Sequence, residues 1–238
     1  MSRSVVIDCF FDGDKKYPAD YAIVAIDVIR ATTTAITAVD LGRDCYPVSS
    51  LEMALTVTHF LENPILGGEL GGNMPFGFEI QNSPTQLVIR TDVQRPLILL
   101  STSGTKLIKH YETSNSVYIA CLRNYEAMTN FLADEHTKVA LIGAGTREEF
   151  REEDQLCCAW IANGLIQQGF IPENEETEEF INTWKNSAVD VILNGKSAEY
   201  LRRSKQEADL DFILQHINDN KKVYRMESGK IKEITFQI

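Results

Sequence analysis

The amino-acid sequence predicts a layered α/β/α fold whose sheet is largely parallel or mixed, built as one domain or as two closely packed subdomains. The 238 residues are enough to bury a sizeable core. Short β-rich runs alternate with helix-like or loop segments, at residues 4–10, 21–27, 97–101, 116–120 and 138–143. Continuously apolar stretches at 22–26 and 96–100 are typical of strands buried on both faces. A functional site is therefore expected beyond the C-terminal ends of these strands.

The later part of the chain differs in composition. From about residue 172 to 219 the sequence is polar and helix-favouring, which predicts a smaller helical portion within a single domain spanning residues 1–238. After it, residues 222–224 and 231–236 flank Ser228-Gly229, a turn signal between alternating runs. This pattern predicts a terminal hairpin.

The charge and the cysteines exclude several classes of protein. A net charge of −11 argues against a nucleic-acid or anionic-membrane binder, because both need an excess of Lys and Arg. No apolar run approaches the roughly 20 residues of a membrane helix, and no basic leader precedes an apolar stretch. The five cysteines lie in mostly apolar surroundings without a Cys/His cluster, which predicts reduced, buried thiols and no zinc site. We expect a cytoplasmic protein, and the acidic surface with exposed sheet edges favours a homodimer.

The first candidate site is the segment 27–34, which follows a predicted buried strand and precedes a predicted helix. Asp27 offers an oxygen ligand for Mg²⁺, Arg30 can hold a phosphate or sulfonate, and Thr32 and Thr33 could complete the cradle. The alternative is a helix cap at either threonine with a local Asp27–Arg30 ion pair. Ile29 stands where the aspartyl-phosphate enzymes of the haloacid dehalogenase type need a second Asp, so that mechanism is disfavoured.

A glycine-rich segment forms the second candidate. Residues 67–72 read Gly-Gly-Glu-Leu-Gly-Gly, and Glu69 and Glu79 place two carboxylates in the same predicted loop. Glycine lets a backbone approach a ligand closely, so the loop could line a metal or substrate site. An ordinary surface loop, with Asn82 or Ser83 capping a short helix, is the alternative.

Two further strand ends carry polar residues. Ser103, Gly104 and Thr105 follow an apolar run and could cradle a phosphate, although a plain capped turn would use the same residues. At the next strand end, Arg123 and Asn124 could bind an anion or begin a helix.

The segment from residue 142 to 154 offers the last candidate. Gly143 and Gly145 hint at a dinucleotide fingerprint, but Glu148 stands where the third glycine should fall, which disfavours NAD binding and an oxidoreductase. Glu153 and Asp154 begin a nearly all-apolar helix. They could serve as Mg²⁺ ligands or only complement the helix dipole.

Taken together, these segments resemble the 2-phosphosulfolactate phosphatase family. The residues that carry the resemblance are Asp27-Val28-Ile29-Arg30-Ala31-Thr32, Gly68-Glu69, the segment 77–84 reading Gly-Phe-Glu-Ile-Gln-Asn-Ser-Pro, Ser103-Gly104-Thr105, and Glu153-Asp154. Two positions depart from the usual family residues, with Glu79 in place of Asp and Ser103 in place of Asn.

The resemblance implies Mg²⁺-dependent hydrolysis of (2R)-2-phospho-3-sulfolactate to 3-sulfolactate and phosphate, a step of coenzyme M biosynthesis. Another small 2-phosphorylated acid is the alternative substrate, and a non-catalytic sensor of a phosphometabolite is the alternative class. On this hypothesis Asp27 and Arg30 are catalytic. The expected metal ligands are Asp27, Glu69, Glu153 and Asp154, and the expected substrate-binding residues are Thr32, Thr33, Ser103, Gly104, Thr105, Arg123 and Asn124.

Overall fold

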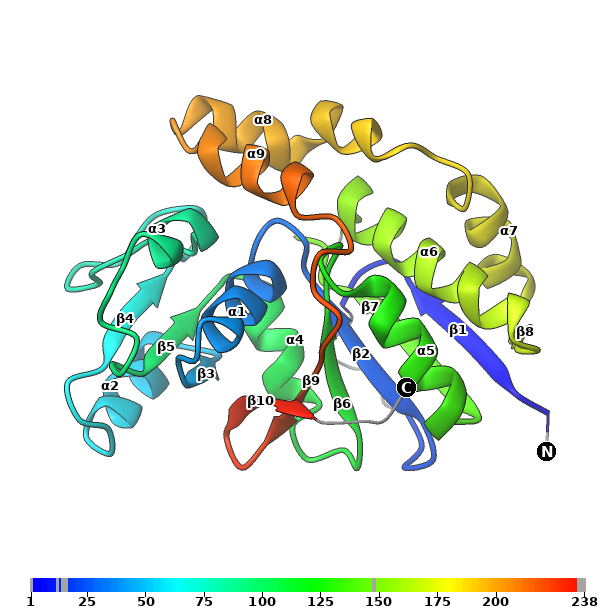
Figure 1. Cartoon of the computed structure of the whole chain (residues 1–238), viewed down its shortest axis with the longest axis horizontal. Helices are drawn as coiled ribbons and strands as arrows, with labels where there is room; N and C mark the ends of the chain where they lie inside the picture. Colours follow the sequence, from blue (N-terminus) through cyan, green and yellow to red (C-terminus); the bar gives the residue numbers. More distant parts are fainter. Residues whose placement is uncertain (1, 12, 14–16, 147–148, 235–238) are drawn as a thin grey trace.

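The computed structural model describes residues 2–11, 13, 17–146 and 149–234 (Figure 1). The strands are β1 Ser4–Asp8, β2 Ala22–Ile26, β3 Cys45–Val48, β4 Ile65–Gly68, β5 Leu97–Leu100, β6 Val117–Ala120, β7 Lys138–Gly143, β8 Ile171–Pro172, β9 Val223–Glu227 and β10 Lys230–Ile234. The helices are α1 Ala31–Asp40, α2 Leu51–Thr58, α3 Pro84–Val88, α4 Gly104–His110, α5 Tyr125–Glu135, α6 Glu152–Gln167, α7 Glu175–Trp184, the 3₁₀ helix η1 Val189–Asn194, α8 Lys196–Arg203 and α9 Glu207–Gln215.

One mixed sheet contains the described strands, in the order β4-β5-β3-β10-β9-β6-β2-β7-β1-β8. Strands β4, β5 and β3 form one parallel group, and β6, β2, β7, β1 and β8 form another. The antiparallel hairpin β9–β10 lies between the groups and reaches β3 through a single residue pair, Ile231 with Cys45. The layered α/β fold expected from the sequence is confirmed.

A continuous core joins the two groups of strands. Strands β2, β5 and β6 are buried at every residue, as their apolar composition predicts. One cluster of buried side chains runs from Ile65 on β4 to Val5 on β1. Helix α1 packs against elements of both groups, including β3 and β6, so it occupies their junction.

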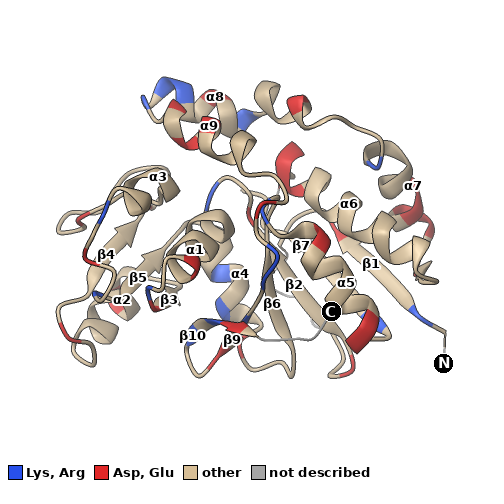
Figure 2. Cartoon of the chain, viewed as in Figure 1, with Lys and Arg blue, Asp and Glu red and all other residues tan. Residues whose placement is uncertain are grey.

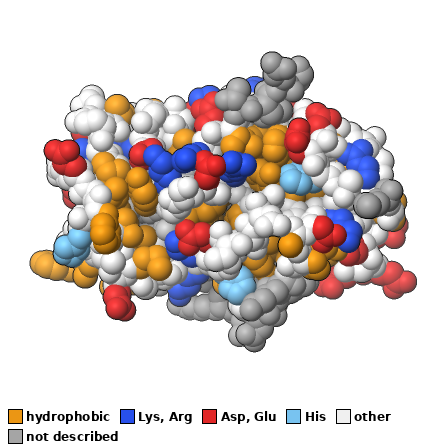
Figure 3. Space-filling view, turned by 90° about the horizontal axis from the view of Figure 1, so that it is seen from below, with side chains coloured by type: hydrophobic (Ala, Val, Ile, Leu, Met, Phe, Trp, Pro, Cys, Tyr) orange, Lys and Arg blue, Asp and Glu red, His pale blue; other side chains and the backbone are white. Residues whose placement is uncertain are grey.

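The helices are distributed unevenly around the sheet (Figure 1). Helices α5, α6 and α7 pack against one another in that order, and α6 also contacts β1, β2 and β7. Helices α8 and α9 pack together and lie over the upper edge of the molecule in Figure 1. The opposite edge, seen in Figure 3, mixes hydrophobic with charged side chains.

The sequence predicted several elements and missed others. The five predicted strands and the terminal hairpin are present, and positive φ angles at Ser228 (52°) and Gly229 (81°) form its turn. Residues 235 and 236 of that predicted segment lie outside the described residues. Strand β4 was missed because Gly67 and Gly68 resemble a loop. They are required by close packing, since a Cβ at Gly68 would collide with the backbone of Leu100.

The predicted helical portion near 172–219 contains α7, η1, α8 and α9. No helix within the described part of the chain combines the length and the apolar character needed to cross a bilayer.

Candidate active site

A cavity of about 230 Å³ opens where the C-terminal ends of β2, β4, β5 and β7 converge beneath α8. This position matches the expectation for strands of an α/β sheet. The lining residues are Asp27, Ile29, Arg30, Glu69, Gly71, Gly72, Asn82, Thr102, Ser103, Gly145, Thr146, Arg151, Asp154, Lys196, Ser197, Tyr200 and Leu201.

Asp27 lies at the base of the cavity, directly after β2. Its Oδ1 accepts the N–H of Ala31 at 3.1 Å, so the carboxylate lies at the start of α1. Gly104 packs against the same side chain, and a Cβ at position 104 would overlap Asp27 Oδ2. Burial raises the pKa of Asp27 to about 6 and the charge of Glu69 acts in the same direction, whereas the N–H groups of Ala31 and Gly104 lower it.

Glu69 enters the cavity from the loop after β4. Its Oε1 accepts the N–H of Thr102 at 2.7 Å, and its Oε2 accepts the hydroxyl of Thr102 and the N–H of Gly72, both at 2.7 Å. The carboxylate therefore joins the loops after β4 and β5. Glu79, the other carboxylate predicted in this loop, turns outward and pairs with Arg95.

Asp154 reaches the cavity from the first turn of α6, whose acidic start is marked in Figure 2. Its Oδ1 accepts the N–H of Val28 at 2.8 Å and its Oδ2 accepts the N–H of Gly145 at 3.3 Å. Burial raises the pKa of Asp154 well above its ordinary value, and the neighbouring charges of Asp27 and Glu153 add to the rise.

Glu153 is fully buried but does not line the cavity. Neither of its carboxylate oxygens has a hydrogen-bond partner among the described residues. Burial raises its pKa to about 7, and the charges of Asp27 and Glu152 contribute, while the nearby Ser197 opposes the rise. Its side chain lies against Gly195, the residue that precedes α8.

The carboxylates are buried close to other negative charges, and a bound cation would reduce the unfavourable energy of that burial. Beyond the effect of burial, the charge of Glu69 raises the pKa of Asp27, the charge of Asp27 raises the pKa values of Glu153 and Asp154, and Glu153 has two oxygens without partners in the described chain. Within the described ranges no three acidic, His or Cys side chains converge into a complete metal site. Mg²⁺ needs only one or two carboxylates, because it keeps several waters and completes its shell with substrate phosphate. Asp27, Glu69 and Asp154 are the carboxylates of the cavity that could supply such ligands.

Cationic side chains also line the cavity. Arg30 donates to Asp209 Oδ2 at 2.5 Å and to Gln206 Oε1 at 2.6 Å. Lys196, at the start of α8, donates to Glu149 at 2.6 Å, and Arg151 donates to the same carboxylate at 3.4 Å. The cavity therefore brings carboxylates and cationic side chains together, as the recognition of a metal-bound anion requires.

The predicted threonines turn away from the cavity. Thr32 donates to the carbonyl of Asp27 at 2.7 Å, and Thr33 donates to the carbonyl of Val28 at 2.8 Å. Thr105 accepts the N–H of Ser101 at 2.8 Å and is fully buried. These hydroxyls shape the turns that position Asp27 and Ser103, and Ser103 itself lines the cavity.

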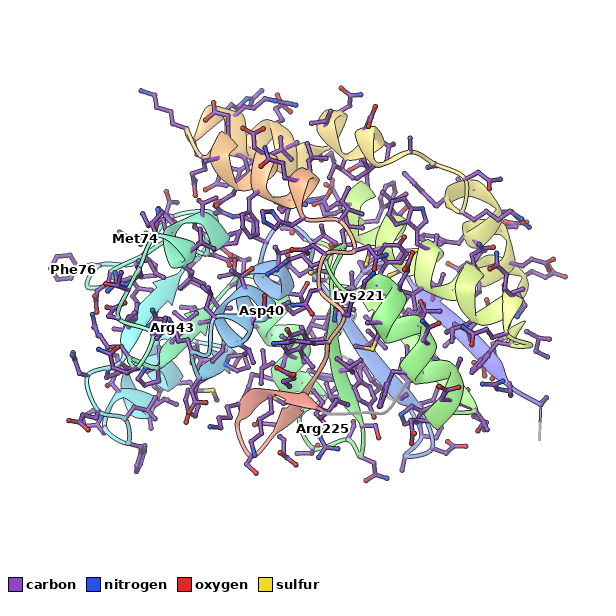
Figure 4. All side chains as sticks on the ribbon, viewed as in Figure 1. Asp40, Arg43, Met74, Phe76, Lys221 and Arg225 are labelled. Atoms are coloured by element: carbon purple, nitrogen blue, oxygen red, sulfur yellow. The ribbon has the colours of Figure 1, made fainter. Side chains whose placement is uncertain are left out.

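Arg123 and Asn124 are also placed elsewhere. Arg123 pairs with Asp219 through two hydrogen bonds of 3.0 and 2.9 Å and reaches Asp40, the last residue of α1, which is labelled in Figure 4. The Asn124 side chain accepts the N–H of Cys121 at 3.0 Å and is fully buried. Both residues lie in the loop that follows β6. Arg123 contacts the last residue of α1, whereas Asp27 lies before the first residue of that helix. Glu148, on which the exclusion of a dinucleotide rested, and Arg147 lie outside the described residues.

Several lining residues were not predicted. Lys196, Ser197 and Tyr200 belong to α8, a polar helix whose sequence shows no motif, and Tyr200 donates a hydrogen bond to the carbonyl of Gly72. Asn82 is 3 % exposed, and its Oδ1 has no partner in the part of the chain that the structure describes. Its place in the quoted Asn-Ser-Pro segment was the available signal.

The fold and the cavity define an α/β protein in which buried carboxylates and cationic side chains meet at the C-terminal edge of a sheet. The family model for 2-phosphosulpholactate phosphatase matches residues 12–227. A probable 2-phosphosulfolactate phosphatase of Symbiobacterium thermophilum is 38% identical over 201 residues, covering 81% of this chain and 85% of its own. One of Carboxydothermus hydrogenoformans is 35% identical over 189 residues, or 79% of each chain.

The chain belongs to the 2-phosphosulpholactate phosphatase family. This membership confirms the family resemblance read from the motifs and the expected class of enzyme, a phosphoric monoester hydrolase.

Proposed function

We propose that the protein is a Mg²⁺-dependent phosphatase that hydrolyses (2R)-2-phospho-3-sulfolactate to 3-sulfolactate and phosphate, the reaction type of coenzyme M biosynthesis. The observation that carries the proposal is the cavity in which Asp27, Glu69 and Asp154 face Arg30, Arg151 and Lys196, in a chain of this family. A small anionic phosphoester suits both the charge and the size of this cavity.

Different side chains of the protein would bind the two ends of the substrate. Arg30 would bind the phosphoryl oxygens, because its guanidinium lies beside Asp27 at the base of the cavity. Arg151 and Lys196 would bind the sulfonate or carboxylate and release Glu149 from its ion pairs. In the net in-line displacement, a bond forms between phosphorus and an oxygen derived from water, and the bond between phosphorus and the ester oxygen on carbon 2 breaks; that oxygen takes up a proton from the water and leaves as the 2-hydroxyl of 3-sulfolactate.

Asp27, with Glu69 and Asp154, would hold Mg²⁺. Glu153 is next to Asp154 in α6 but does not line the cavity. When bound, Mg²⁺ would neutralise part of the negative charge on the phosphoryl oxygens. The cationic side chains stabilise the rest of that charge, and the walls from α8 reduce access of water.

The test is phosphate release by metal-stripped protein from 2-phosphosulfolactate, phospholactate, phosphoglycerate and p-nitrophenyl phosphate, with Mg²⁺ and then with EDTA. We expect Mg²⁺-dependent release that favours the sulfonated substrate. Release from the other acids alone would retire this substrate, and phosphoester binding without release would favour a sensor. Calorimetric titration with Mg²⁺ supplies a second readout, in which Asp27→Asn should weaken binding.

A further inference from the structure

Asp209 on α9 connects three parts of the molecule without lining the cavity. It is 1 % exposed. Its Oδ2 accepts from Arg30 Nη1 at 2.5 Å, and its Oδ1 accepts from Ser83 Oγ at 2.7 Å, Thr85 Oγ1 at 2.5 Å and Thr85 N at 3.2 Å. One buried carboxylate therefore binds the segment before α1, the start of α3 and the helix layer above the cavity.

The orientation of Arg30 follows from this contact. Among the described residues, only Nη1 of its guanidinium has hydrogen-bond acceptors, namely Asp209 and Gln206. Arg30 lines the cavity, so Nε and Nη2 stay free for an anion there. Arg30 also lies near enough to Asp27 to lower the pKa of that carboxyl. Without Asp209, the guanidinium would turn toward Asp27 and the other carboxylates of the cavity.

The second oxygen of Asp209 fixes another wall. Ser83 is the N-cap of α3, and its hydroxyl both accepts the N–H of Gln86 and donates to Asp209. Asn82, directly before it, is buried and lines the cavity with an unpartnered Oδ1 among the described residues. A shift of Ser83 would therefore move Asn82 as well.

We propose that Asp209 is a positioning residue that orients Arg30 and Asn82 for substrate and docks the α8–α9 layer through the same contacts. The inference rests on the proposed function, because it assigns Arg30 to the phosphoryl group. Its general basis is that a buried guanidinium takes the direction set by its fixed acceptors.

Asp209→Asn tests the assignment. The amide keeps the shape of the side chain but removes the charge that holds Arg30. We expect kcat/KM to fall about 10- to 100-fold, the range found when a residue that orients a ligand is removed. The KM and the inhibition constant for inorganic phosphate should rise together, because the anion site is misaligned.

Asp92→Asn is the matched control. Asp92 also accepts four hydrogen bonds from its neighbours, through Arg43, Arg90 and Arg95, but it lies before β5, at the opposite end from the cavity. Arg43, labelled in Figure 4, lies in the β3–β5 part of the molecule, away from α8 and α9. We expect this variant to lose stability while keeping the KM and the phosphate affinity of the unchanged protein.

A double-mutant cycle separates positioning from a general structural role. In an Arg30→Ala background, Asp209→Asn should weaken phosphate binding by a smaller factor than it does in the unchanged protein, because the part of its effect that acts through Arg30 is already lost and only the part through Asn82 remains. Additive losses would refute the assignment. If Asp209→Asn does not fold, Gln206→Leu removes the other acceptor of Arg30 Nη1 without burying a charge and should raise the same phosphate constant.

The two hypotheses fail differently. Wild-type turnover together with an unchanged KM in Asp209→Asn overturns the positioning role and leaves the phosphatase standing. Absence of turnover in the unchanged protein overturns the phosphatase, and calorimetric titration with inorganic phosphate then decides the role of Asp209.

Discussion

Glu69 and Glu79 belong to one loop, yet the surroundings of their side chains differ. Glu69 fixes the backbone of Thr102 and Gly72 inside the cavity, whereas Glu79 is exposed and paired with Arg95. We expect Glu69→Gln to lower kcat/KM by about 10- to 100-fold, as loss of a ligand or of its support does. Glu79→Gln should stay within about 2-fold of the unchanged protein, since exposed ion pairs contribute little. Steady-state kinetics on both variants checks this pair, and equal losses would contradict it.

Gly104 is a second position where a single atom decides the geometry. An added Cβ would lie 2.8 Å from Asp27 Cβ and 2.7 Å from Ala31 Cβ, and it would overlap Asp27 Oδ2. We expect Gly104→Ala to displace Asp27, to lower kcat by at least about 10-fold and to cost about 1–3 kcal/mol of unfolding free energy. Gly164→Ala is the control, because its Cβ would meet Thr129 Cγ2 at 2.6 Å, far from the cavity. Thermal melts should show a change in both variants, but only Gly104→Ala should lose turnover.

At the scale of elements, α8 lines the cavity and carries its most accessible cation. Lys196 forms a solvent-exposed ion pair with Glu149. We expect Lys196→Met to raise KM several-fold for substrates with a sulfonate or carboxylate, because their second anion loses a partner. The KM for p-nitrophenyl phosphate, which lacks that second anion, should hardly change. A parallel rise for both substrates would mean that Lys196 acts on the phosphate itself.

The elements also show what could be predicted from the sequence. Apolar strands such as β2 and β5 were recognisable because burial on both faces leaves no polar residue in the run. Asp27, Arg30, Ser103 and Asp154 were found because they follow predicted strands or begin a predicted helix, and Glu69 was found because it lies in a glycine-rich segment. The direction of a side chain was not predictable in the same way. Thr32 and Thr105 satisfy local backbone groups, and nothing in their spacing distinguishes that role from ligand binding.

Long-range contacts explain the rest. Tyr200 and Asp209 meet Gly72 and Arg30 only after the chain has crossed the sheet, more than a hundred residues later in the sequence. A polar helix carries no local signal for such a meeting. The Phe76 side chain, directly before the quoted 77–84 segment, projects from the edge of the molecule in Figure 4, whereas Phe78 within that segment is buried, and composition alone does not distinguish the two.

At the scale of the whole molecule, the shared core predicts cooperative unfolding. The main cluster of buried side chains continues from β4 across the hairpin to β1, and a smaller cluster around Ile98 and Leu100 belongs to the β3–β5 group alone, so the two parallel groups share most of their core. We expect far-UV circular dichroism and the fluorescence of Trp160 and Trp184 to report one urea transition with the same midpoint. Two separated midpoints would instead support two subdomains that unfold independently.

The position of the β9–β10 hairpin has a consequence for synthesis on the ribosome. Its strands come late in the chain but stand in the middle of the sheet, between β3 and β6. Until residues 223–234 have emerged, the nascent protein exposes two unpaired strand edges where the finished protein has none. Such edges invite pairing with other chains, so a translation pause or truncation shortly before the hairpin should produce a species that depends on chaperones to stay unaggregated.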